Sequence, residues 1–322
     1  MKLGVLTNLF GAETFESALA KFQKLGIESV EIGCGGYPGK AHCDPELLLS
    51  DDLALAKWLA LIDEYGMDVS ALSVHGNPVH PDKAISEKFH SDFERAVLLA
   101  EKIGVDTVVT FSGCPGGCPE DKTPNWATCA WPDDYLAVLD YQWNEVLIPY
   151  WKKTAEFCKA HGVTKIAFEM HPGFCVYNPE TLLKLRAAVG DIIGANFDPS
   201  HLIWQGIDPV RAIRALKGAI YHFHAKDTKI DKYNTAINGV LDTKHYTDEE
   251  NRSWIFRSVG YGNGLDYWRD IISALRLAGY DKVMSIEHED SLMTAEEGLS
   301  HAVSFLKESI IKAPKPSSIS WA

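Results

Sequence analysis

The stretch KIAFEMHP at residues 165–172 is an apolar run that carries a carboxylate, Glu169, near its carboxyl end. Three later runs repeat this form, namely IGANFDPSH (193–201), AIYHFHAKD (219–227) and KVMSIEHED (282–290). Each of them carries a further ionisable side chain at the corresponding point: Asp198, His224 and Glu287. Because the carboxyl ends of parallel strands meet at one end of a sheet, we expect these four side chains to converge.

The converging side chains form a ligand set for one divalent metal ion. Three carboxylates and one imidazole suit a hard or borderline cation, whereas structural zinc sites often use thiolates. We predict Mn²⁺ in the first place, with Mg²⁺ and Co²⁺ as alternatives. The glycine-rich segment GCGGYPG at 33–39 lacks the GK[ST] ending of a nucleotide-binding loop, and no organic cofactor is predicted.

Strand-like and helix-like runs alternate eight times along the chain, a pattern typical of a parallel sheet surrounded by helices. The other four strands are predicted at 3–8, 29–33, 68–76 and 107–113. The amphipathic runs between strands mostly end in glycine, the usual helix stop. We therefore predict a single α/β domain, a (β/α)₈ TIM barrel over residues 1–312, followed by a flexible C-terminal tail at 313–322.

A long insert at residues 228–264 follows the seventh predicted strand. It contains Trp254 and Arg257 among several aromatic and basic residues, and it is too aromatic for a disordered linker. The insert begins on the face where the metal ion is expected, so we predict that it closes over the substrate as a lid. A subunit interface is the alternative, because aromatic residues serve that purpose equally well.

The charge balance favours a small-molecule substrate. The chain has 31 basic and 44 acidic residues and a net charge of −13, which argues against nucleic acid and an anionic membrane as partners. Seven scattered cysteines lack the spacing of a disulfide framework, and the first twenty residues lack the apolar core of a signal peptide. We expect a cytoplasmic protein and leave the formation of a homo-oligomer open.

Over almost its full length the chain resembles the xylose-isomerase-like TIM barrel superfamily. This superfamily of sugar phosphate isomerases and epimerases includes the tagatose and psicose 3-epimerases and the inosose-processing enzymes. The motifs that carry the resemblance are Glu169, Asp198-Pro199-Ser200-His201, His224-Ala225-Lys226-Asp227 and Ile286-Glu287.

The resemblance implies roles for individual residues. Four of them would bind one divalent ion: Glu169, Asp198, His224 and Glu287. Glu169 and Glu287 would also be the catalytic residues that move a proton, and His201 would contact or orient the substrate. We name six further candidates for substrate binding: His75, His171, Lys226, Asp227, Trp204 and Arg257. His222 is expected on the opposite side of its strand, facing the helices as a hydrogen-bonded core residue.

The predicted activity is a divalent-metal-dependent isomerisation or epimerisation of a keto-sugar or a related polyol ketone. The ion would acidify the proton next to the carbonyl. One glutamate would remove this proton and the other would return it, through an enediolate held at the metal ion. The same site suits a lyase or dehydratase that acts on a 3-keto-glycoside or an inosose. An endonuclease IV-like nuclease conflicts with the acidic charge, and a non-catalytic sugar-binding barrel does not need two metal-bound glutamates.

Overall fold

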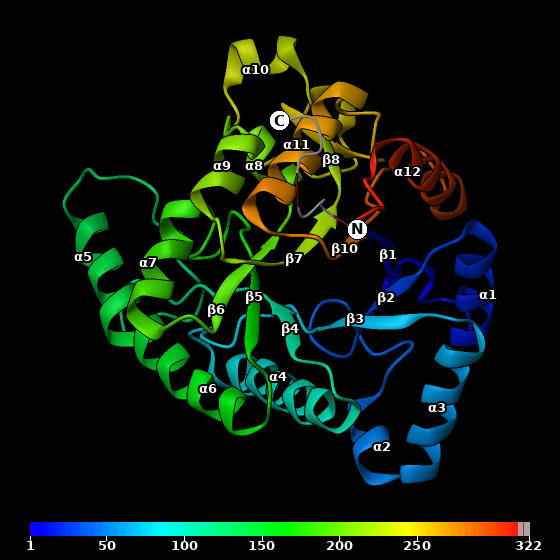
Figure 1. The fold of residues 1–322 in the computed structure, drawn as a ribbon. Helices are drawn as coiled ribbons and strands as arrows, with labels where there is room; N and C mark the ends of the chain where they lie inside the picture. Colours follow the sequence, from blue (N-terminus) through cyan, green and yellow to red (C-terminus); the bar gives the residue numbers. More distant parts are fainter. Residues whose placement is uncertain (315–317, 319–322) are drawn as a thin grey trace.

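The computed structural model describes residues 1–314 and 318, and a closed barrel of eight parallel strands forms its centre (Figure 1). The strands follow one another around the barrel in the order β1-β10-β7-β6-β5-β4-β3-β2, and β1 pairs with both β10 and β2 to close it. The barrel strands are β1 (Lys2–Leu6), β2 (Ser29–Gly33), β3 (Asp68–Ser73), β4 (Thr107–Thr110), β5 (Lys165–Glu169), β6 (Ile193–Phe197), β7 (Ile220–Ala225) and β10 (Val283–Ile286). The predicted α/β TIM barrel is confirmed.

Most of the helices surround this barrel on its outside (Figure 1). The α-helices are α1 (Phe15–Leu25), α2 (Pro45–Ser50), α3 (Asp52–Glu64), α4 (Lys83–Ile103), α5 (Asp134–Asp140), α6 (Ile148–Ala160), α7 (Pro179–Val189), α8 (Pro199–Trp204), α9 (Pro209–Ala215), α10 (Lys232–Asn238), α11 (Leu265–Ala278) and α12 (Ala295–Ser309). Three short segments of other helix types are η1 (Thr7–Phe10), η2 (Tyr141–Leu147) and η3 (Glu249–Asn251).

Several strands end earlier than the sequence pattern predicts. The run at 193–201 is predicted as one strand, yet β6 ends at Phe197 and the following residues begin α8. The reason is local, because Asp198 caps α8 by accepting a hydrogen bond from the backbone N–H of Ser200 (2.8 Å), and Pro199 occupies the first helical turn. Asp198 therefore lies at the junction between strand and helix, at the carboxyl end of the barrel.

The interior of the barrel changes from apolar to polar along the strands. Ala71, Val109 and Ala167 are fully buried and form a small cluster of their own. Two residues further along β3 and β5, and thus on the same face of each strand, are Ser73 and Glu169. The carboxyl end of the barrel interior consequently carries polar groups that need partners.

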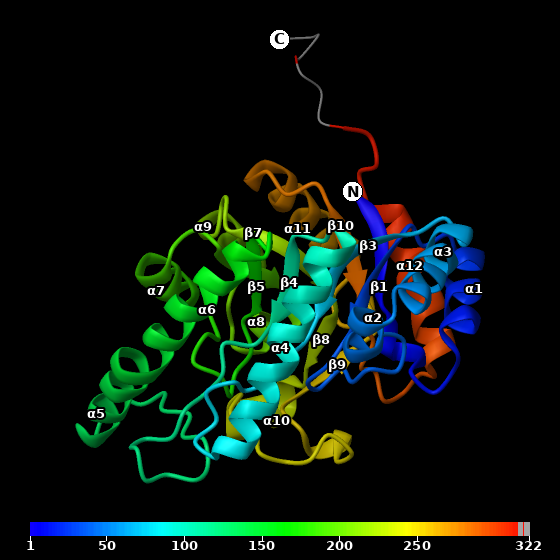
Figure 2. The ribbon, with the colours of Figure 1, turned by 90° about the horizontal axis from the view of Figure 1, so that it is seen from below.

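The insert after β7 forms a small antiparallel hairpin of β8 (Asp227–Ile230) and β9 (Trp254–Arg257), in which Asp227 pairs with Arg257 and Ile230 with Trp254. Helices α10 and η3 lie between these two strands in the sequence. Figure 2 shows α10 and the hairpin at the end of the molecule opposite the N-terminus. The insert thus lies at the end of the barrel that is formed by the carboxyl ends of the strands.

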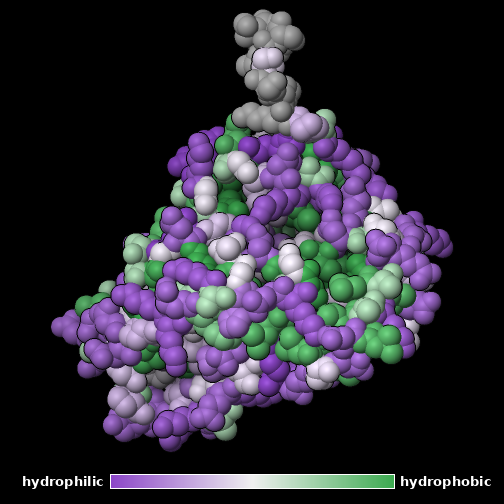
Figure 3. All heavy atoms as spheres, turned by 60° about the horizontal axis from the view of Figure 1, so that its bottom comes forward, coloured by the Kyte–Doolittle hydropathy of each residue, from purple (hydrophilic) through white to green (hydrophobic). Residues whose placement is uncertain are grey.

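Polar side chains cover much of the face seen in Figure 3, with hydrophobic areas between them. Among residues 1–314 and 318, no helix combines the length and the hydropathy that crossing a membrane requires. The predicted flexible tail at 313–322 lies largely outside the described residues.

Candidate metal centre

The four predicted metal ligands come together at the carboxyl end of the barrel. Glu169 is the last residue of β5, Asp198 follows β6 directly, His224 lies in β7 and Glu287 follows β10 directly. One ligand atom of each lies within 4.8 Å of the others, and all four residues are buried apart from a partly exposed Glu287. The strand-end positions are what bring these groups together, as their spacing in the sequence indicates.

The free atoms of this cluster fit a divalent cation. Oδ2 of Asp198, Nδ1 of His224 and Oε2 of Glu287 are buried and make no hydrogen bond within the described part of the chain. Their close neighbours are other charged groups, since Nδ1 of His224 lies 3.1 Å from Oε2 of Glu287 and 3.2 Å from Oε2 of Glu169. The ammonium group of Lys226 balances only part of the negative charge of these buried carboxylates, and a cation bound among them would lower the remaining cost of burying that charge.

Glu31 orients the imidazole of His224. The Nε2–H of His224 donates to the two carboxylate oxygens of Glu31, at 2.9 and 3.0 Å, which turns Nδ1 toward the other carboxylates. Glu31 is itself held by the hydroxyls of Ser73 and Ser285. A carboxylate behind a metal-binding histidine sets its tautomer and its ring orientation in this way. The sequence pattern did not reveal Glu31, although one acidic residue within the buried run SVEIG (29–33) was the available signal.

The pKa of His224 shows how strongly the site attracts positive charge. Burial lowers this pKa, but the carboxylates of Glu31, Glu287 and Glu169 outweigh burial and hold it well above its usual range. Without an ion, a proton on Nδ1 partly balances the carboxylates. Metal binding needs that nitrogen unprotonated, so ion and proton compete for it.

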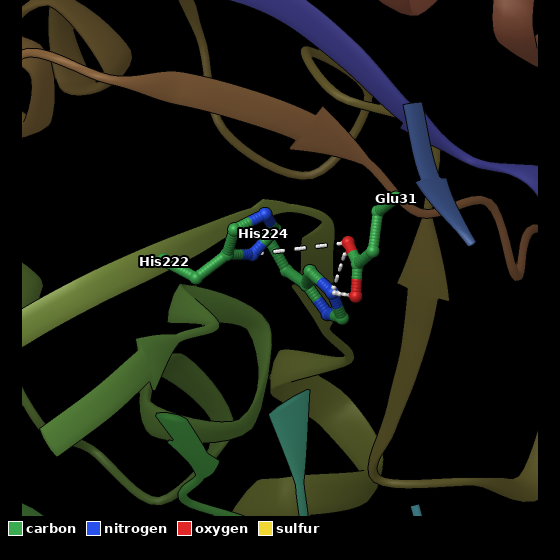
Figure 4. A group of neighbouring side chains, drawn as sticks. All are labelled: Glu31, His222 and His224. Atoms are coloured by element: carbon green, nitrogen blue, oxygen red, sulfur yellow. Dashed lines mark hydrogen bonds and ion pairs between the residues drawn. The ribbon is translucent and has the colours of Figure 1, made fainter. Parts of the chain in front are cut away.

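His222 lies inside the barrel with Glu31 and His224 (Figure 4), and the prediction that it faces the helices is wrong. Residues two apart on a strand point to the same side, so His222 must share the face of His224. Its ring nitrogens lie 3.0 Å from Oδ1 of Asn196 and 3.2 Å from Oγ of Ser70. Burial lowers its pKa to about 4, and the ring is a neutral, hydrogen-bonded part of the barrel interior.

Two histidines hold the carboxylate of Glu169. The Nε2–H of His201 donates to Oε1 of Glu169 at 2.9 Å, and the Nε2–H of His75 donates to Oε2 at 3.0 Å. Burial would raise the pKa of Glu169, but His201, His224 and His75 hold it well below its usual range. Burial lowers the pKa of His201 to about 3, so this ring stays neutral.

Lys226 supplies a positive charge at the edge of the cluster. Its Nζ lies 2.8 Å from Oε2 of Glu287, 3.0 Å from Oε2 of Glu289 and 3.1 Å from Oδ2 of Asp198. Burial opposes the charge of Lys226, but these carboxylates raise its pKa well above the usual range. Burial raises the pKa of Asp198 to about 7, even though Lys226 acts in the opposite direction. Burial also raises the pKa of Glu287, but the positive charges of Lys226 and His224 outweigh burial and lower this pKa to about 2.

A cavity of about 250 Å³ opens above the cluster and is here called the metal-side cavity. Its lining includes the two predicted catalytic residues and the predicted substrate-binding residues His75, His171 and Lys226. The lining residues are Leu6, Asn8, Tyr37, Pro38, His75, Phe111, Glu169, His171, Lys226, Glu287 and Glu289. Glu289 is a second residue that the sequence pattern did not single out, although it follows Glu287 by two positions on the chain.

A second cavity of about 430 Å³, here called the insert compartment, adjoins the first. Its lining combines residues of the insert with residues after β10, and it shares His171 and Glu289 with the metal-side cavity. The lining residues are His171, Tyr246, Ile255, Phe256, Glu289 and Ser291.

Four of the predicted substrate-binding residues line neither cavity, and their role in substrate binding stays a prediction: His201, Asp227, Trp204 and Arg257. The carboxylate of Asp227 accepts hydrogen bonds from the backbone N–H groups of Gly260, Gly262 and Asn263 and from Nε1 of Trp268, so it anchors the return of the insert. Trp204 stacks on Trp254 at 4.4 Å between ring centroids, and Arg257 pairs with Asp290 and Glu249 at 3.2 Å each. Asp227 follows Lys226 in an extended segment, so the two side chains point to opposite sides.

Residues 19–309 match the model of the xylose isomerase-like TIM barrel family, and the chain belongs to this family. It is 41% identical over 313 residues to the uncharacterized protein YfiH of Bacillus subtilis (strain 168), a match that covers 96% of this chain and 99% of YfiH.

Solved structures show the same fold at lower identity. The probable 3-DHS dehydratase AsbF of Bacillus anthracis has a TM-score of 0.65 at 17% identity, covering 95% of this chain and 99% of AsbF. A D-tagatose 3-epimerase-like protein has a TM-score of 0.64 at 20% identity, and the IolI protein with a zinc atom has 0.65 at 19% identity. Both of these matches cover 96% of this chain and 98% of the other.

Proposed function

We propose that the protein is a divalent-metal-dependent isomerase or epimerase of a keto-sugar or a related polyol ketone. The observation that carries this proposal is the pair Glu169 and Glu287, which line one cavity and belong to the same cluster of potential metal ligands. Glu169 ends β5 and Glu287 follows β10, and β6 and β7 separate these two strands in the barrel, so the glutamates reach the cavity from different sides. Two such carboxylates are what a proton removal and a proton return at one carbon require.

The metal ligands and the residues that contact them would each have a role in the reaction. Bound by Glu169, Asp198, His224 and Glu287, a divalent ion would polarise the substrate carbonyl and acidify the neighbouring C–H. Glu169 and Glu287 have lowered pKa values and are therefore ionised at neutral pH, ready to accept that proton. His201 and His75 keep the carboxylate of Glu169 in one orientation, and Lys226 does so for Glu287. His171 and His75 line the cavity where they can hydrogen-bond the hydroxyls of a sugar.

The identity of the metal ion, the cellular location and the class of substrate are parts of the same proposal. We propose Mn²⁺ as the native ion, with Mg²⁺ and Co²⁺ as alternatives, because three of the four ligands are carboxylates. The solved structure of the IolI protein contains a zinc atom. The activity of the protein after reconstitution with each of these ions should therefore identify the native ion. We further propose a cytoplasmic enzyme that acts on a small molecule and not on nucleic acid, in keeping with its net charge of −13.

A lyase or dehydratase is the second candidate function. Removal of a proton next to a carbonyl can be followed by loss of a substituent from the adjacent carbon, with the same base and the same ion. The insert compartment favours this candidate, because it offers room for a substituent beside the metal-side cavity. The fold is also shared by the probable 3-DHS dehydratase AsbF.

Proton NMR in deuterated water tests the proposal directly. The metal-loaded protein is incubated with a panel of ketoses, inososes and 3-keto-glycosides. An isomerase or epimerase would place deuterium on the carbon next to the carbonyl and yield an isomer of the substrate, whereas a lyase would release the substituent. Absence of exchange and of product across the whole panel, with the protein shown to hold metal, would contradict both candidates.

A further inference from the structure

The insert compartment borders the metal-side cavity. The side chains of His171 and Glu289 line both cavities, so the two spaces lie on either side of these residues. The metal-side cavity, at about 250 Å³, lies below the usual range of roughly 300–1,000 Å³ for small-molecule sites. The insert compartment is larger, at about 430 Å³. A single sugar ring at the metal would therefore leave the larger part of the space unused.

The two cavities differ in chemistry. Around the metal-side cavity, carboxylates, imidazoles and an ammonium group can hydrogen-bond hydroxyl groups. In the insert compartment, the insert contributes only Tyr246, Ile255 and Phe256, and the charged or ring-nitrogen groups lie at the shared boundary. A second hydroxyl-rich ring would find few partners between these side chains, whereas an apolar ring would bury its surface against them.

The apolar wall is held in place by its own contacts. The rings of Tyr246 and Phe256 stack at 5.8 Å, and behind them Trp254 stacks on Trp204. Arg252 is buried and lies 4.2 Å from the centroid of the Tyr246 ring, and it also donates to the backbone oxygen of Trp254. A wall that is already ordered loses little conformational entropy when a ligand binds.

Phe256 lines the insert compartment and contacts Lys226, which lines the metal-side cavity. Its ring lies 5.3 Å from the imidazole of His201, and Nζ of Lys226 lies 4.6 Å from its centroid. Tyr246, in contrast, is 47% exposed at the outer side of the compartment. The compartment thus leads from the groups that surround Glu169 outward to solvent.

We infer that the insert compartment is a second subsite, and that it binds an apolar, ring-sized substituent attached to the keto-sugar. The substrate class is then a substituted keto-sugar, such as a keto-glycoside with an aromatic aglycone. The sugar ring lies at the metal-side cavity, and the substituent lies between Tyr246, Ile255 and Phe256. This inference rests on the proposed function for the identity of the sugar part.

The test compares the binding of methyl and phenyl 3-keto-glucosides to the Mn²⁺-loaded protein by calorimetry. Burial of the phenyl ring should make the phenyl compound bind about tenfold more tightly than the methyl compound. Tyr246→Ala and Ile255→Ser should each bring this ratio toward one while leaving the affinity for the methyl compound nearly unchanged. Tyr233→Ala is the matched control, since this exposed aromatic residue of the same insert does not line the compartment, and it should keep the wild-type ratio.

Several outcomes would overturn the inference. A phenyl compound that binds no better than the methyl compound, or a ratio that Tyr246→Ala and Ile255→Ser leave unchanged, would show that the compartment is not a subsite. Light scattering that shows dissociated subunits in Tyr246→Ala, together with an unchanged ratio, would assign the surface to a subunit interface instead. If neither compound binds, the substrate class is wrong.

The proposed function is judged by a separate measurement. If both compounds bind with the expected ratio but neither exchanges its proton in deuterated water, the subsite stands and the proposed isomerase chemistry fails for these compounds. If only an unsubstituted ketose binds and exchanges, the proposed function stands and the subsite fails.

Discussion

Glu31 acts on the candidate metal centre through the Nε2–H of His224. We predict that Glu31→Gln lowers the affinity for Mn²⁺ by about 10- to 100-fold, because an amide holds the imidazole less firmly and no longer favours its tautomer. Competition with a metal-sensitive dye would measure this loss. Glu16→Gln, at an exposed position in the first turn of α1, is the control and should leave the affinity unchanged. A folded Glu31→Gln protein with wild-type affinity would show that Glu31 does not support the metal ligand.

The two proposed bases can be tested at the same scale. Glu169→Gln and Glu287→Gln should each lower turnover by about 10²–10⁴-fold, because an amide keeps an oxygen for the ion but cannot accept a proton. Metal content has to be determined for each variant alongside deuterium exchange. If either variant held a full complement of metal and kept wild-type turnover, the corresponding glutamate would not be a base.

The hairpin of β8 and β9 is the element that decides whether the insert closes over the substrate. Trp254 contributes the stack on Trp204, and its replacement leaves a void that costs about 3–5 kcal/mol locally. We therefore predict that Trp254→Ala lowers kcat/KM on the true substrate and leaves the affinity for Mn²⁺ nearly unchanged, since no metal ligand lies in the hairpin.

Steady-state kinetics with light scattering separates the lid from a subunit interface. Unaltered kinetics per folded chain in a dissociated Trp254→Ala protein would refute the lid and favour the interface. Tyr233→Ala serves again as the control, because this side chain is 73% exposed on α10.

At the scale of the whole molecule, metal binding and stability are coupled. An ion that binds only the folded chain adds about 2.7 kcal/mol to the free energy of unfolding when its concentration is 100 times its Kd. Removal of the ion by a chelator should accordingly lower the Tm, and addition of Mn²⁺ should restore it. A Tm that is equal with and without bound metal would contradict a site built from the folded barrel.

The pH dependence of this coupling follows from two raised pKa values. In the metal-free protein the pKa of Asp198 is raised to about 7 by burial, and that of His224 is raised well above its usual range by the carboxylates around it. A group with a raised folded-state pKa binds protons more tightly when folded, so its contribution to stability is lost as pH rises. For Asp198 this loss falls between about pH 4 and 7, and for His224 it begins above about pH 6.5. The difference in Tm between metal-loaded and metal-free protein should thus grow from pH 5 to pH 8, and a constant difference would contradict this reasoning.

The barrel itself could be predicted from the chain because its signals are local. Eight apolar runs with helices between them define the strands, and Glu169, Asp198, His224 and Glu287 mark the strand ends at which active sites of such barrels lie. The boundaries were less predictable, because the cap at Asp198 and the following Pro199 convert the end of an apparent strand into α8.

Only the tertiary structure decided what lies around these ligands. Glu31 and His224 are 193 residues apart, and barrel closure through β1 and β10 brings their side chains together across the interior. The sequence led to the prediction that Asp227 binds the substrate, yet backbone N–H groups of the returning insert donate hydrogen bonds to its carboxylate. A local sequence pattern predicts the type of element in which a side chain lies and the chemistry that the side chain offers. The partners of that side chain depend on the closure of the barrel and on the path of the insert, because both arise from contacts between segments that are distant in the sequence.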